Sequence, residues 1–312
     1  MNEFRDRGHV EGLPDDLAGF PWGLPDPFLG IPANETPFSN SPVVILPVPY
    51  EATVSYMGGT RFGPRGLIHA SRYVELYDHE LDMDPHTIGI HTLPELMLSA
   101  AGPEQALATL RRCYDALLDH GKFVVLLGGE HSVSGDPILA HAARHDRISV
   151  LQLDAHADLR SEYEGSSLSH ACVMHRVHEH VDLVPVGIRS LTADERALMR
   201  AGDIEAVWGH EIEQGDWVDR VIDRLGDHVY VTFDVDYLDP AYMPSTGTPE
   251  PGGGSWYQSL ALLERVFRER TVVGCDVVEL APIPGMVGPD VLAAELVYKL
   301  IAFHATYGSG ND

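Results

Sequence analysis

Cysteine and long apolar runs are both scarce in this 312-residue sequence. The three cysteines, Cys113, Cys172 and Cys275, are odd in number and widely spaced, which predicts reduced thiols and a cytoplasmic setting instead of a disulfide framework. No apolar run approaches the roughly 18 residues that a membrane span needs, so no span is expected. The segment from Met1 to Asp6 lacks the basic and apolar regions of a signal peptide, so no signal peptide is expected.

Basic residues are also few, since 21 Lys and Arg stand against 47 Asp and Glu, for a formal net charge of −26. This balance argues against nucleic acid and anionic membrane surfaces as partners. It is compatible with a small cationic substrate that is attracted to a negative cleft. A highly soluble surface explains most of the charge, and some carboxylates can instead neutralise bound metal.

The remaining composition is ordinary for a globular protein, with 44% hydrophobic residues. Residues 1–40 are rich in proline and show no sustained periodicity. We predict that they form an N-terminal arm, laid on the body or on a neighbouring subunit. Residues 41–312 contain no dividing linker and no internal repeat, and are predicted to form a single domain.

Apolar strands alternate with helices from residue 42 onward. Strands are expected at 42–49, 123–127, 148–153, 183–188, 229–233 and 272–278. Helices are expected at 64–76, 103–121, 138–143, 216–225, 256–269 and 289–304, and after Thr192, where Glu195 completes a capping box. Strands that are apolar throughout and alternate with helices predict an α/β fold, in which helices cover both faces of a mostly parallel sheet. The result is a three-layer α/β/α sandwich.

Three metal-capable side chains occupy alternate positions directly after the strand at 148–153. Asp154, His156 and Asp158 would lie on one face of an extended segment, with roughly 6–7 Å between successive side chains. Burying two carboxylates and an imidazole together is costly unless they share a cation. The spacing therefore predicts a metal site.

The same residue types follow three other predicted strands, namely His131 after 123–127, Asp234 and Asp236 after 229–233, and Glu279 after 272–278. Each pattern alone is commonly a polar loop, a helix cap or a turn. Ligands bind at the carboxyl ends of the strands in such a sheet, so the joint pattern indicates one shared site. Four carboxylates and two imidazoles without a thiol favour Mn²⁺ over structural zinc, and six ligands suit two ions. The expected chemistry is hydrolysis by a hydroxide that bridges the two ions.

Four motifs, in this order along the chain, resemble the ureohydrolase family, which includes arginases and agmatinases. They are GGEHS at 128–132, DAHAD at 154–158, Ser169-His170, and DVDYLDP at 234–240 with the following run 244–253. The likeness extends from about residue 43 to residue 302. It implies a three-layer α/β/α sandwich on a parallel sheet of about eight strands, with two Mn²⁺ ions and a ureohydrolase-type catalytic domain at 41–312.

The resemblance also implies a role for each site residue. One Mn²⁺ would be held by His131, Asp154, Asp158 and Asp234, and the second by His156, Asp154, Asp234 and Asp236, so that Asp154 and Asp234 bridge the ions. The predicted catalytic residues are Asp158, His170, which would pass a proton to the departing amine, and Glu279, which would bind the guanidinium group of the substrate. The alternative for His170 is a polar loop residue. Arginases usually carry glycine after this histidine, whereas this chain has Ala171, as in some agmatinase-like chains.

The loop at 159–169 decides the predicted substrate. Arginases bind an amino-acid carboxylate with Asn and Ser donors in this loop, whereas this loop has no Asn and carries Glu162 and Glu164. A negative loop attracts the distal ammonium of agmatine and repels a carboxylate. We therefore expect the hydrolysis of agmatine to putrescine and urea, a step of polyamine biosynthesis.

Arg160 does not fit this expectation, since it either pairs with Glu162 or binds a substrate carboxylate. The alternatives are a hydrolase of a guanidino acid such as 4-guanidinobutyrate, a hydrolase of another small guanidine and, less favoured, an arginase. A non-catalytic metal-binding relative or scaffold is the alternative from another functional class. The resemblance also implies a homo-oligomer, a trimer or a hexamer, in which the N-terminal arm is a candidate contact.

Overall fold

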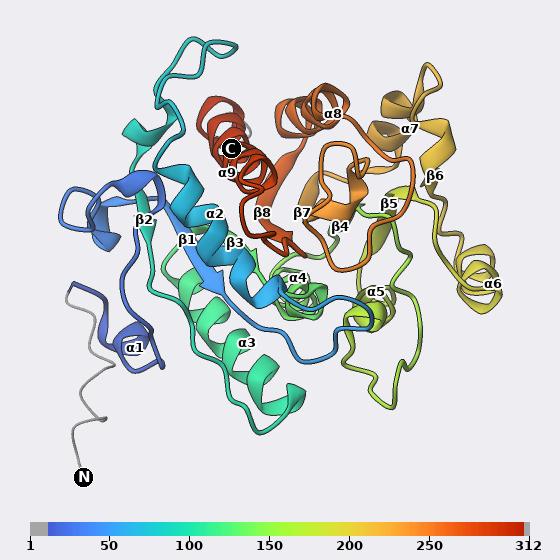
Figure 1. Ribbon diagram of the computed structural model, residues 1–312, viewed down its shortest axis with the longest axis horizontal. Coiled ribbons are helices and arrows are strands. Elements are labelled where there is room, and N and C mark those ends of the chain that lie inside the picture. The colour runs from blue at the N-terminus through green and yellow to red at the C-terminus, as the bar shows by residue number, and fades with distance from the viewer. Residues whose placement is uncertain (1–11, 309–312) are drawn as a thin grey trace.

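A computed structural model describes residues 12–308 of the chain. At its centre lies an eight-stranded sheet with the order β2-β1-β3-β8-β7-β4-β5-β6, in which all neighbouring strands pair in parallel (Figure 1). The strands are β1 Val43–Val48, β2 Ile90–Thr92, β3 Phe123–Gly128, β4 Ser149–Leu153, β5 Asp182–Ile188, β6 Val207–Trp208, β7 His228–Asp234 and β8 Thr271–Val278. The predicted α/β fold on a sheet of about eight strands is confirmed.

Helices cover both faces of the sheet. They are α1 Asp15–Ala18, α2 Gly63–Ser71, α3 Pro103–Asp119, α4 Gly135–Ala142, α5 Val173–Val177, α6 Ala193–Ala201, α7 Trp217–Arg224, α8 Trp256–Glu269 and α9 Gly288–Tyr307. Helices α2, α7, α8 and α9 share one hydrophobic core with strand residues such as Val43 and Ile45, whereas α1, α3, α4, α5 and α6 share the second core with Val44 and Leu46. Successive residues of a strand point to opposite faces, so each fully apolar strand contributes to both cores.

The part of the predicted arm that the structure describes packs on the body of the protein. Leu17, Trp22 and Phe38 are buried in the core that contains α3, and Phe28 is buried in the core that contains α2. The Trp22 indole donates a hydrogen bond to the Leu17 carbonyl, and Trp22 also pairs with Leu96 in an isolated bridge. Residues 12–40 thus complete the hydrophobic cores, while residues 1–11 of the predicted arm lie outside the described residues.

Two local predictions need correction and a third is confirmed. The helix predicted at 64–76 ends at Ser71, because the chain turns there and the Ser71 hydroxyl bonds back to the Ile68 carbonyl. The edge strands β2 and β6 were not identified individually, since elements of three and two residues are too short to show a period. The capping box at Thr192 and Glu195 is present as predicted and begins α6.

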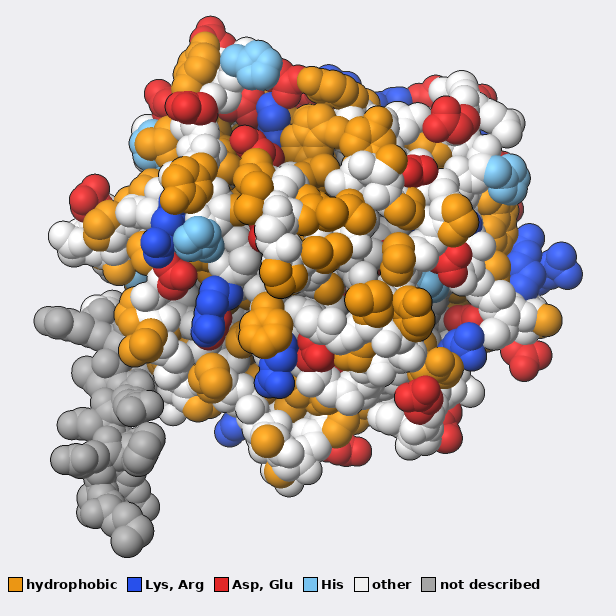
Figure 2. Space-filling view, viewed as in Figure 1, with side chains coloured by type: hydrophobic (Ala, Val, Ile, Leu, Met, Phe, Trp, Pro, Cys, Tyr) orange, Lys and Arg blue, Asp and Glu red, His pale blue; other side chains and the backbone are white. Residues whose placement is uncertain are grey.

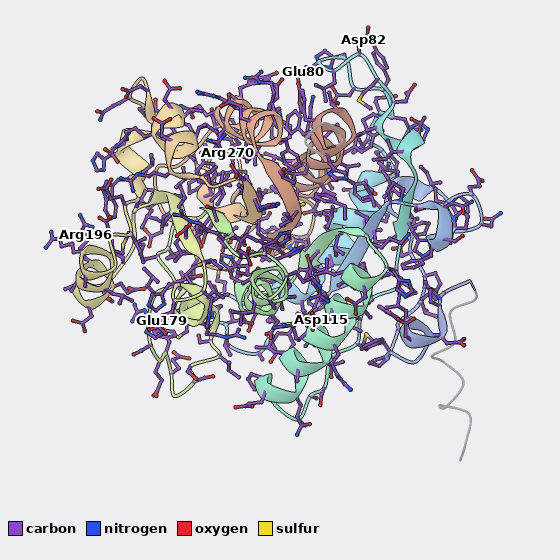
Figure 3. All side chains as sticks on the ribbon, turned by 180° about the vertical axis from the view of Figure 1, so that it is seen from behind. Glu80, Asp82, Asp115, Glu179, Arg196 and Arg270 are labelled. Atoms are coloured by element: carbon purple, nitrogen blue, oxygen red, sulfur yellow. The ribbon has the colours of Figure 1, made fainter. Side chains whose placement is uncertain are left out.

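Charged and large hydrophobic side chains both reach the surface of the described part of the chain. Asp82 and Glu179 are exposed at its periphery (Figure 3). Tyr56, Phe62 and Val287 are also more than half exposed, and Figure 2 shows hydrophobic side chains across the middle of one face. Among residues 12–308, no helix combines the length and the apolar character needed to traverse a bilayer.

Candidate metal centre and active site

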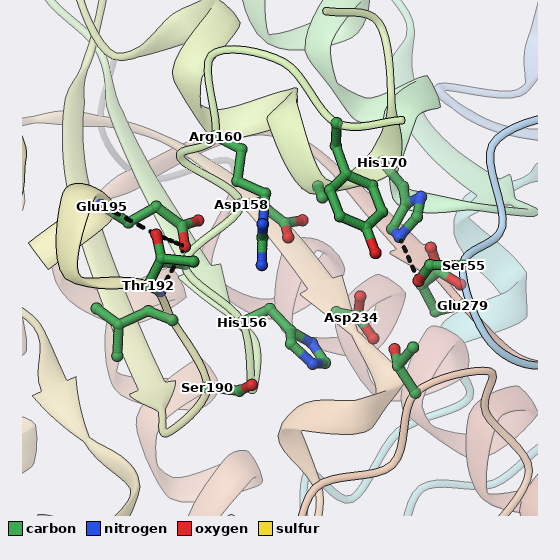
Figure 4. Close-up of a pocket in the computed structure, with 15 residues that line it drawn as sticks. Ser55, His156, Asp158, Arg160, His170, Ser190, Thr192, Glu195, Asp234 and Glu279 are labelled. Carbon is green, nitrogen blue, oxygen red and sulfur yellow. Dashed lines mark hydrogen bonds between the residues drawn. The ribbon is translucent and has the colours of Figure 1, made fainter. Parts of the chain in front are cut away.

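Four neighbouring strands in the middle of the sheet, β3, β8, β7 and β4, end at the candidate site. Each carries one part of the predicted constellation at its carboxyl end: His131 after β3, Glu279 after β8, Asp234 and Asp236 at the end of β7, and Asp154, His156 and Asp158 after β4. Residues that are up to 148 positions apart in sequence therefore meet at one edge of the sheet, as in the hydrogen bond from the His131 backbone N–H to Glu279 Oε1 at 2.6 Å. Figure 4 shows this region with its lining side chains.

A first group of potential metal ligands surrounds the imidazole of His131. Its Nδ1 lies 3.2 Å from Asp154 Oδ2, 3.1 Å from Asp158 Oδ2 and 3.3 Å from Asp234 Oδ2. His131 is only 1% exposed, and among residues 12–308 its Nδ1 has no partner with hydrogen-bond geometry. A buried nitrogen without a hydrogen-bond partner, aimed at three carboxylates, is the arrangement that a shared cation satisfies.

A second group surrounds the half-buried imidazole of His156. Its Nδ1 lies 3.0 Å from Asp236 Oδ2 and 3.6 Å from Asp154 Oδ1. Asp154 therefore belongs to both groups, with one carboxylate oxygen facing each histidine. The four Asp residues carry four negative charges when ionised, which two divalent cations neutralise. The six side chains thus fit a pair of divalent ions held by oxygen and nitrogen ligands.

The burial of so many ionisable groups shifts their protonation equilibria. Burial raises the pKa of the carboxyl groups of Asp158, Asp234 and Glu279, and for Asp158 and Asp234 the neighbouring acidic charges raise it further. Burial opposes protonation of His156, but the charge of Asp236 and the hydrogen bonds to Asp154 and Asp236 outweigh it and raise its pKa to about 12. Burial likewise opposes protonation of His131, and its three Asp neighbours outweigh it. Without bound cations, bound protons would therefore have to compensate the negative charge of the buried carboxylates.

Two of these residues have backbone conformations that residues other than glycine rarely adopt. Asp158 has a φ of 53° and Glu279 a φ of 66°, both in the left-handed region. The Asp158 carbonyl accepts hydrogen bonds from the Met174 and His175 backbone N–H groups, and the Glu279 backbone N–H donates to the Gly129 carbonyl at 2.8 Å. Such backbone strain costs on the order of 1–3 kcal/mol per residue and clusters at functional sites.

A cavity of about 230 Å³ opens beside the two groups. Five of the predicted site residues line it, namely His156, Asp158, His170, Asp234 and Glu279. Figure 4 shows His170 and Glu279 on one side of the cavity and Thr192 and Glu195 on the other. The cavity is therefore large enough for a small extended molecule with one end near Glu279 and the metal-ligand groups.

The residues of the loop at 159–169 that line the cavity are not those from which the substrate was predicted. Glu162 and Glu164 are exposed and are not among the residues that line the cavity, whereas Arg160 and Tyr163 are. The guanidinium carbon of Arg160 lies 4.7 Å from the centre of the Tyr163 ring. Within residues 12–308, Arg160 forms no ion pair with a carboxylate, so the predicted alternative of a salt bridge with Glu162 is not seen.

Sequence reasoning did not identify several other residues at the cavity. Ser55 lies in the loop after β1, with its hydroxyl 3.3 Å from His170 Nε2. Glu195 was assigned only to a helix cap, yet it is buried, accepts the Leu159 backbone N–H and lines the cavity. No spacing in the sequence relates Ser55 to His170, which lies 115 residues away.

Known proteins share this architecture. A sequence profile described as "Arginase family" matches residues 41–302. The N(1)-aminopropylagmatine ureohydrolase of Synechocystis sp. is 38% identical over 277 residues, covering 86% of this chain and 90% of the relative. The agmatinase of Bacillus subtilis is 32% identical over 256 residues, covering 80% of this chain and 87% of the relative. The solved structure of proclavaminate amidino hydrolase from Streptomyces clavuligerus superimposes with a TM-score of 0.83 at 26% identity, covering 91% of this chain and 98% of that chain.

These findings confirm the resemblance deduced from the motifs, as well as the prediction of a hydrolase of the ureohydrolase type. Because the profile covers most of the chain and the relatives exceed 30% identity over four fifths of it, the chain belongs to the arginase family.

Proposed function

We propose that the protein hydrolyses the guanidinium group of an aminoalkylguanidine, either agmatine or its N(1)-aminopropyl derivative, to urea and the corresponding amine. The observation that carries this proposal is the cavity beside the two His/Asp groups, which has the buried carboxylate of Glu279 in its wall. A guanidinium is a planar set of N–H donors that pairs well with a carboxylate.

The names of the relatives support an aminoalkylguanidine as the substrate. The Synechocystis relative, named for N(1)-aminopropylagmatine, is 38% identical, compared with 32% for the Bacillus subtilis agmatinase. We therefore place N(1)-aminopropylagmatine first and agmatine, which the loop sequence predicts, second. The longer substrate would also use more of the cavity, from Glu279 to the side lined by Thr192 and Glu195.

In this proposal each residue of the site has a distinct task. His131, Asp154, Asp158 and Asp234 would hold one Mn²⁺, and His156 and Asp236 would hold the second together with the shared carboxylates. Four carboxylates and two imidazoles without a thiol suit Mn²⁺. The bound ions would supply a water of lowered pKa as the nucleophile for the guanidinium carbon.

The protein side chains would orient the substrate and move the proton. Glu279 would accept hydrogen bonds from the guanidinium and fix its carbon next to the metal-ligand groups. His170 would donate a proton to the alkyl nitrogen as the carbon–nitrogen bond breaks, so that the products leave as urea and an amine. Asp158 would contribute to catalysis as a metal ligand.

A second candidate substrate follows from Arg160. Its guanidinium lines the cavity and forms no ion pair within the described residues, so it is available to bind a substrate carboxylate. This observation favours a guanidino acid such as 4-guanidinobutyrate as the alternative. Glu162 and Glu164 can act on a cationic substrate only through their charge, because neither lines the cavity.

A comparison of four substrates tests the proposal. Urea release from N(1)-aminopropylagmatine, agmatine, 4-guanidinobutyrate and arginine would be measured on one Mn²⁺-loaded preparation, with the metal content determined on the same sample. We expect the highest kcat/KM for an aminoalkylguanidine, and no urea from an Asp154→Asn preparation purified in parallel. A preference for the guanidino acid would select the second candidate. Two bound ions without urea from any guanidine would identify a non-catalytic relative.

A further inference from the structure

We propose that Thr53 is a positioning residue, which fixes the protonated nitrogen of His170 through a chain of hydrogen bonds that ends on the buried carboxylate of Glu130. These hydrogen bonds would keep the proton of the neutral imidazole on Nδ1, so that the unprotonated Nε2 faces the cavity. The inference rests on the proposed function, in which His170 delivers a proton to the departing amine.

Glu130 lies in the turn that follows β3 and is 1% exposed. Its Oε2 accepts the backbone N–H groups of Ala52 and Thr53, both at 2.7 Å. Its Oε1 accepts the hydroxyls of Thr53 at 2.8 Å and Ser132 at 2.6 Å. An ionised carboxylate only accepts hydrogen bonds, so the hydroxyl proton of Thr53 is committed to Glu130.

The Thr53 oxygen therefore has only lone pairs left for His170. It accepts the His170 backbone N–H at 3.0 Å, and it lies 3.3 Å from the ring Nδ1. A hydroxyl whose proton is already donated can only accept, so this contact requires a proton on Nδ1. Ser169 Oγ, 3.4 Å from the same nitrogen, is a second and longer acceptor.

The other ring nitrogen faces the substrate side. His170 Nε2 lies 3.3 Å from the Ser55 hydroxyl, and both residues line the cavity, whereas Thr53 does not. The Tyr163 ring meets the imidazole edge-on, with 6.1 Å between centroids and an interplanar angle of 83°. Ring orientation and proton position are thus both determined before a substrate arrives.

This arrangement matches the proton transfer that the reaction needs. With Nδ1 protonated, the cationic ring carries its second proton on Nε2. When the amine leaves, the Nε2–H bond breaks, a new N–H bond forms on the amine nitrogen, and the ring returns to its neutral form with Nδ1–H retained. In the opposite tautomer Nε2 already carries the proton, so the neutral ring has no proton-accepting nitrogen at the cavity and cannot be protonated again there. Loss of the Thr53 hydroxyl should therefore lower kcat and leave substrate binding nearly unchanged.

A double-mutant cycle tests whether Thr53 acts through His170. Thr53→Val removes the hydroxyl with little change in shape, and should lower kcat by about tenfold or more while KM and metal content stay within about twofold. Thr53→Ser keeps the hydroxyl and should restore kcat. In a His170→Gln background, Thr53→Val should have no further effect, because the residue through which it acts is gone. The same fractional loss in both backgrounds would overturn the proposal. Thr109→Val is the matched control, because within the described part of the chain the Thr109 hydroxyl bonds only to the Gln105 carbonyl on α3.

A spectroscopic measurement tests the same claim without turnover. In metal-free protein with ¹⁵N-labelled histidine, the His170 signals, identified among 17 histidines by their loss in His170→Gln, should show a protonated Nδ1 and an unprotonated Nε2 in the neutral ring. Thr53→Val should shift them towards a mixture of the two tautomers. A protonated Nε2 in the unsubstituted protein would overturn the proposal. If the predicted tautomer is present and no guanidine is hydrolysed, the proposed function fails while the role of Thr53 in fixing the tautomer stands.

Discussion

His131 Nε2 lies 2.9 Å from the Thr232 hydroxyl, on the side of the ring that faces away from the three carboxylates. The Thr232 hydroxyl donates its proton to Asp276 Oδ1 at 2.7 Å, so its oxygen can only accept from the ring. Nε2 therefore carries the proton of the neutral imidazole, and Nδ1 presents a lone pair to the site. A metal-binding histidine is commonly held in this way by a partner on its second nitrogen.

Replacing this partner should weaken metal binding without removing a ligand. Thr232→Val removes the acceptor for His131 Nε2–H, and partners of this kind typically change metal affinity about 10- to 100-fold. Thr232→Ser keeps the hydroxyl and should bind nearly as tightly as the unsubstituted protein. Calorimetric titration of metal-free protein with Mn²⁺ measures the effect. Equal affinity of the Val and Ser variants would show that the hydrogen bond does not orient the ligand.

The number of bound ions should depend on which carboxylate is removed. Asp154 belongs to both ligand groups, whereas the Asp158 carboxylate lies beside His131 and not beside His156, the histidine of the second group. We expect Asp154→Asn to lose both ions and Asp158→Asn to retain the ion at His156. Asp234→Ala should also lose most metal and activity if Asp234 bridges the ions. Elemental analysis after dialysis gives the stoichiometry. Two ions retained in Asp154→Asn would contradict a shared ligand.

Replacing His170 should lower turnover and leave metal binding unchanged. Its ring contacts the side chains of Thr53, Ser55 and Ser169 and none of the proposed metal ligands. Loss of a positioned proton donor typically costs about 10²- to 10⁴-fold in rate. His170→Ala should therefore lower kcat within that range at full metal occupancy. Unchanged turnover would exclude His170 as the proton donor.

The stability of the metal-free protein should decrease as the pH rises. In the folded, metal-free protein the pKa values of His131 and His156 are raised, so the stability they contribute is complete below the unfolded histidine pKa of about 6.5 and is lost as the pH rises. The raised carboxyl pKa values of Asp158 and Asp234 act in the same direction, because the folded state again binds more protons than the unfolded one.

Bound metal replaces these protons, so its affinity should increase with pH. We therefore expect the Tm of metal-free protein to fall between about pH 6 and pH 8.5, while the gain in Tm from added Mn²⁺ grows over the same range. Thermal unfolding followed by circular dichroism at several pH values measures both. A metal-free Tm that rises across this interval would show that the two histidines are not protonated in the folded site.

The sequence was sufficient to predict much of the sheet and the approximate location of the site. Six of the strands are apolar on both faces and long enough to recognise, and polar residues directly after them must reach the same edge when the strands run in parallel. The orientation of loop residues could not be predicted in this way. Nothing in the spacing of residues 159–169 shows that Arg160 and Tyr163 face the cavity while Glu162 does not.

Backbone strain and long-range contacts between loops also could not be predicted from the sequence. The positive φ of Asp158 and Glu279 depends on hydrogen bonds to segments elsewhere in the fold, such as that from Glu279 N–H to the Gly129 carbonyl. The contact of Thr53 with His170 spans 117 residues and belongs to no repeating pattern. Tertiary packing alone decides which of many Ser and Thr residues reach the site.

Arg160 should set the preference between cationic and anionic substrates. Its positive charge in the cavity wall disfavours a distal ammonium and favours a carboxylate, so Arg160→Gln should raise kcat/KM for agmatine relative to 4-guanidinobutyrate by about tenfold or more, an effect of about 1.4 kcal/mol. Glu162→Gln and Glu164→Gln are matched controls that also change one charge in the same loop. Because both residues are exposed outside the cavity wall, they should change the ratio by less than about threefold, and less still at high salt. If the glutamate variants change the ratio more than Arg160→Gln does, the loop carboxylates select the substrate as the sequence suggests, and Arg160 serves mainly to pack against Tyr163.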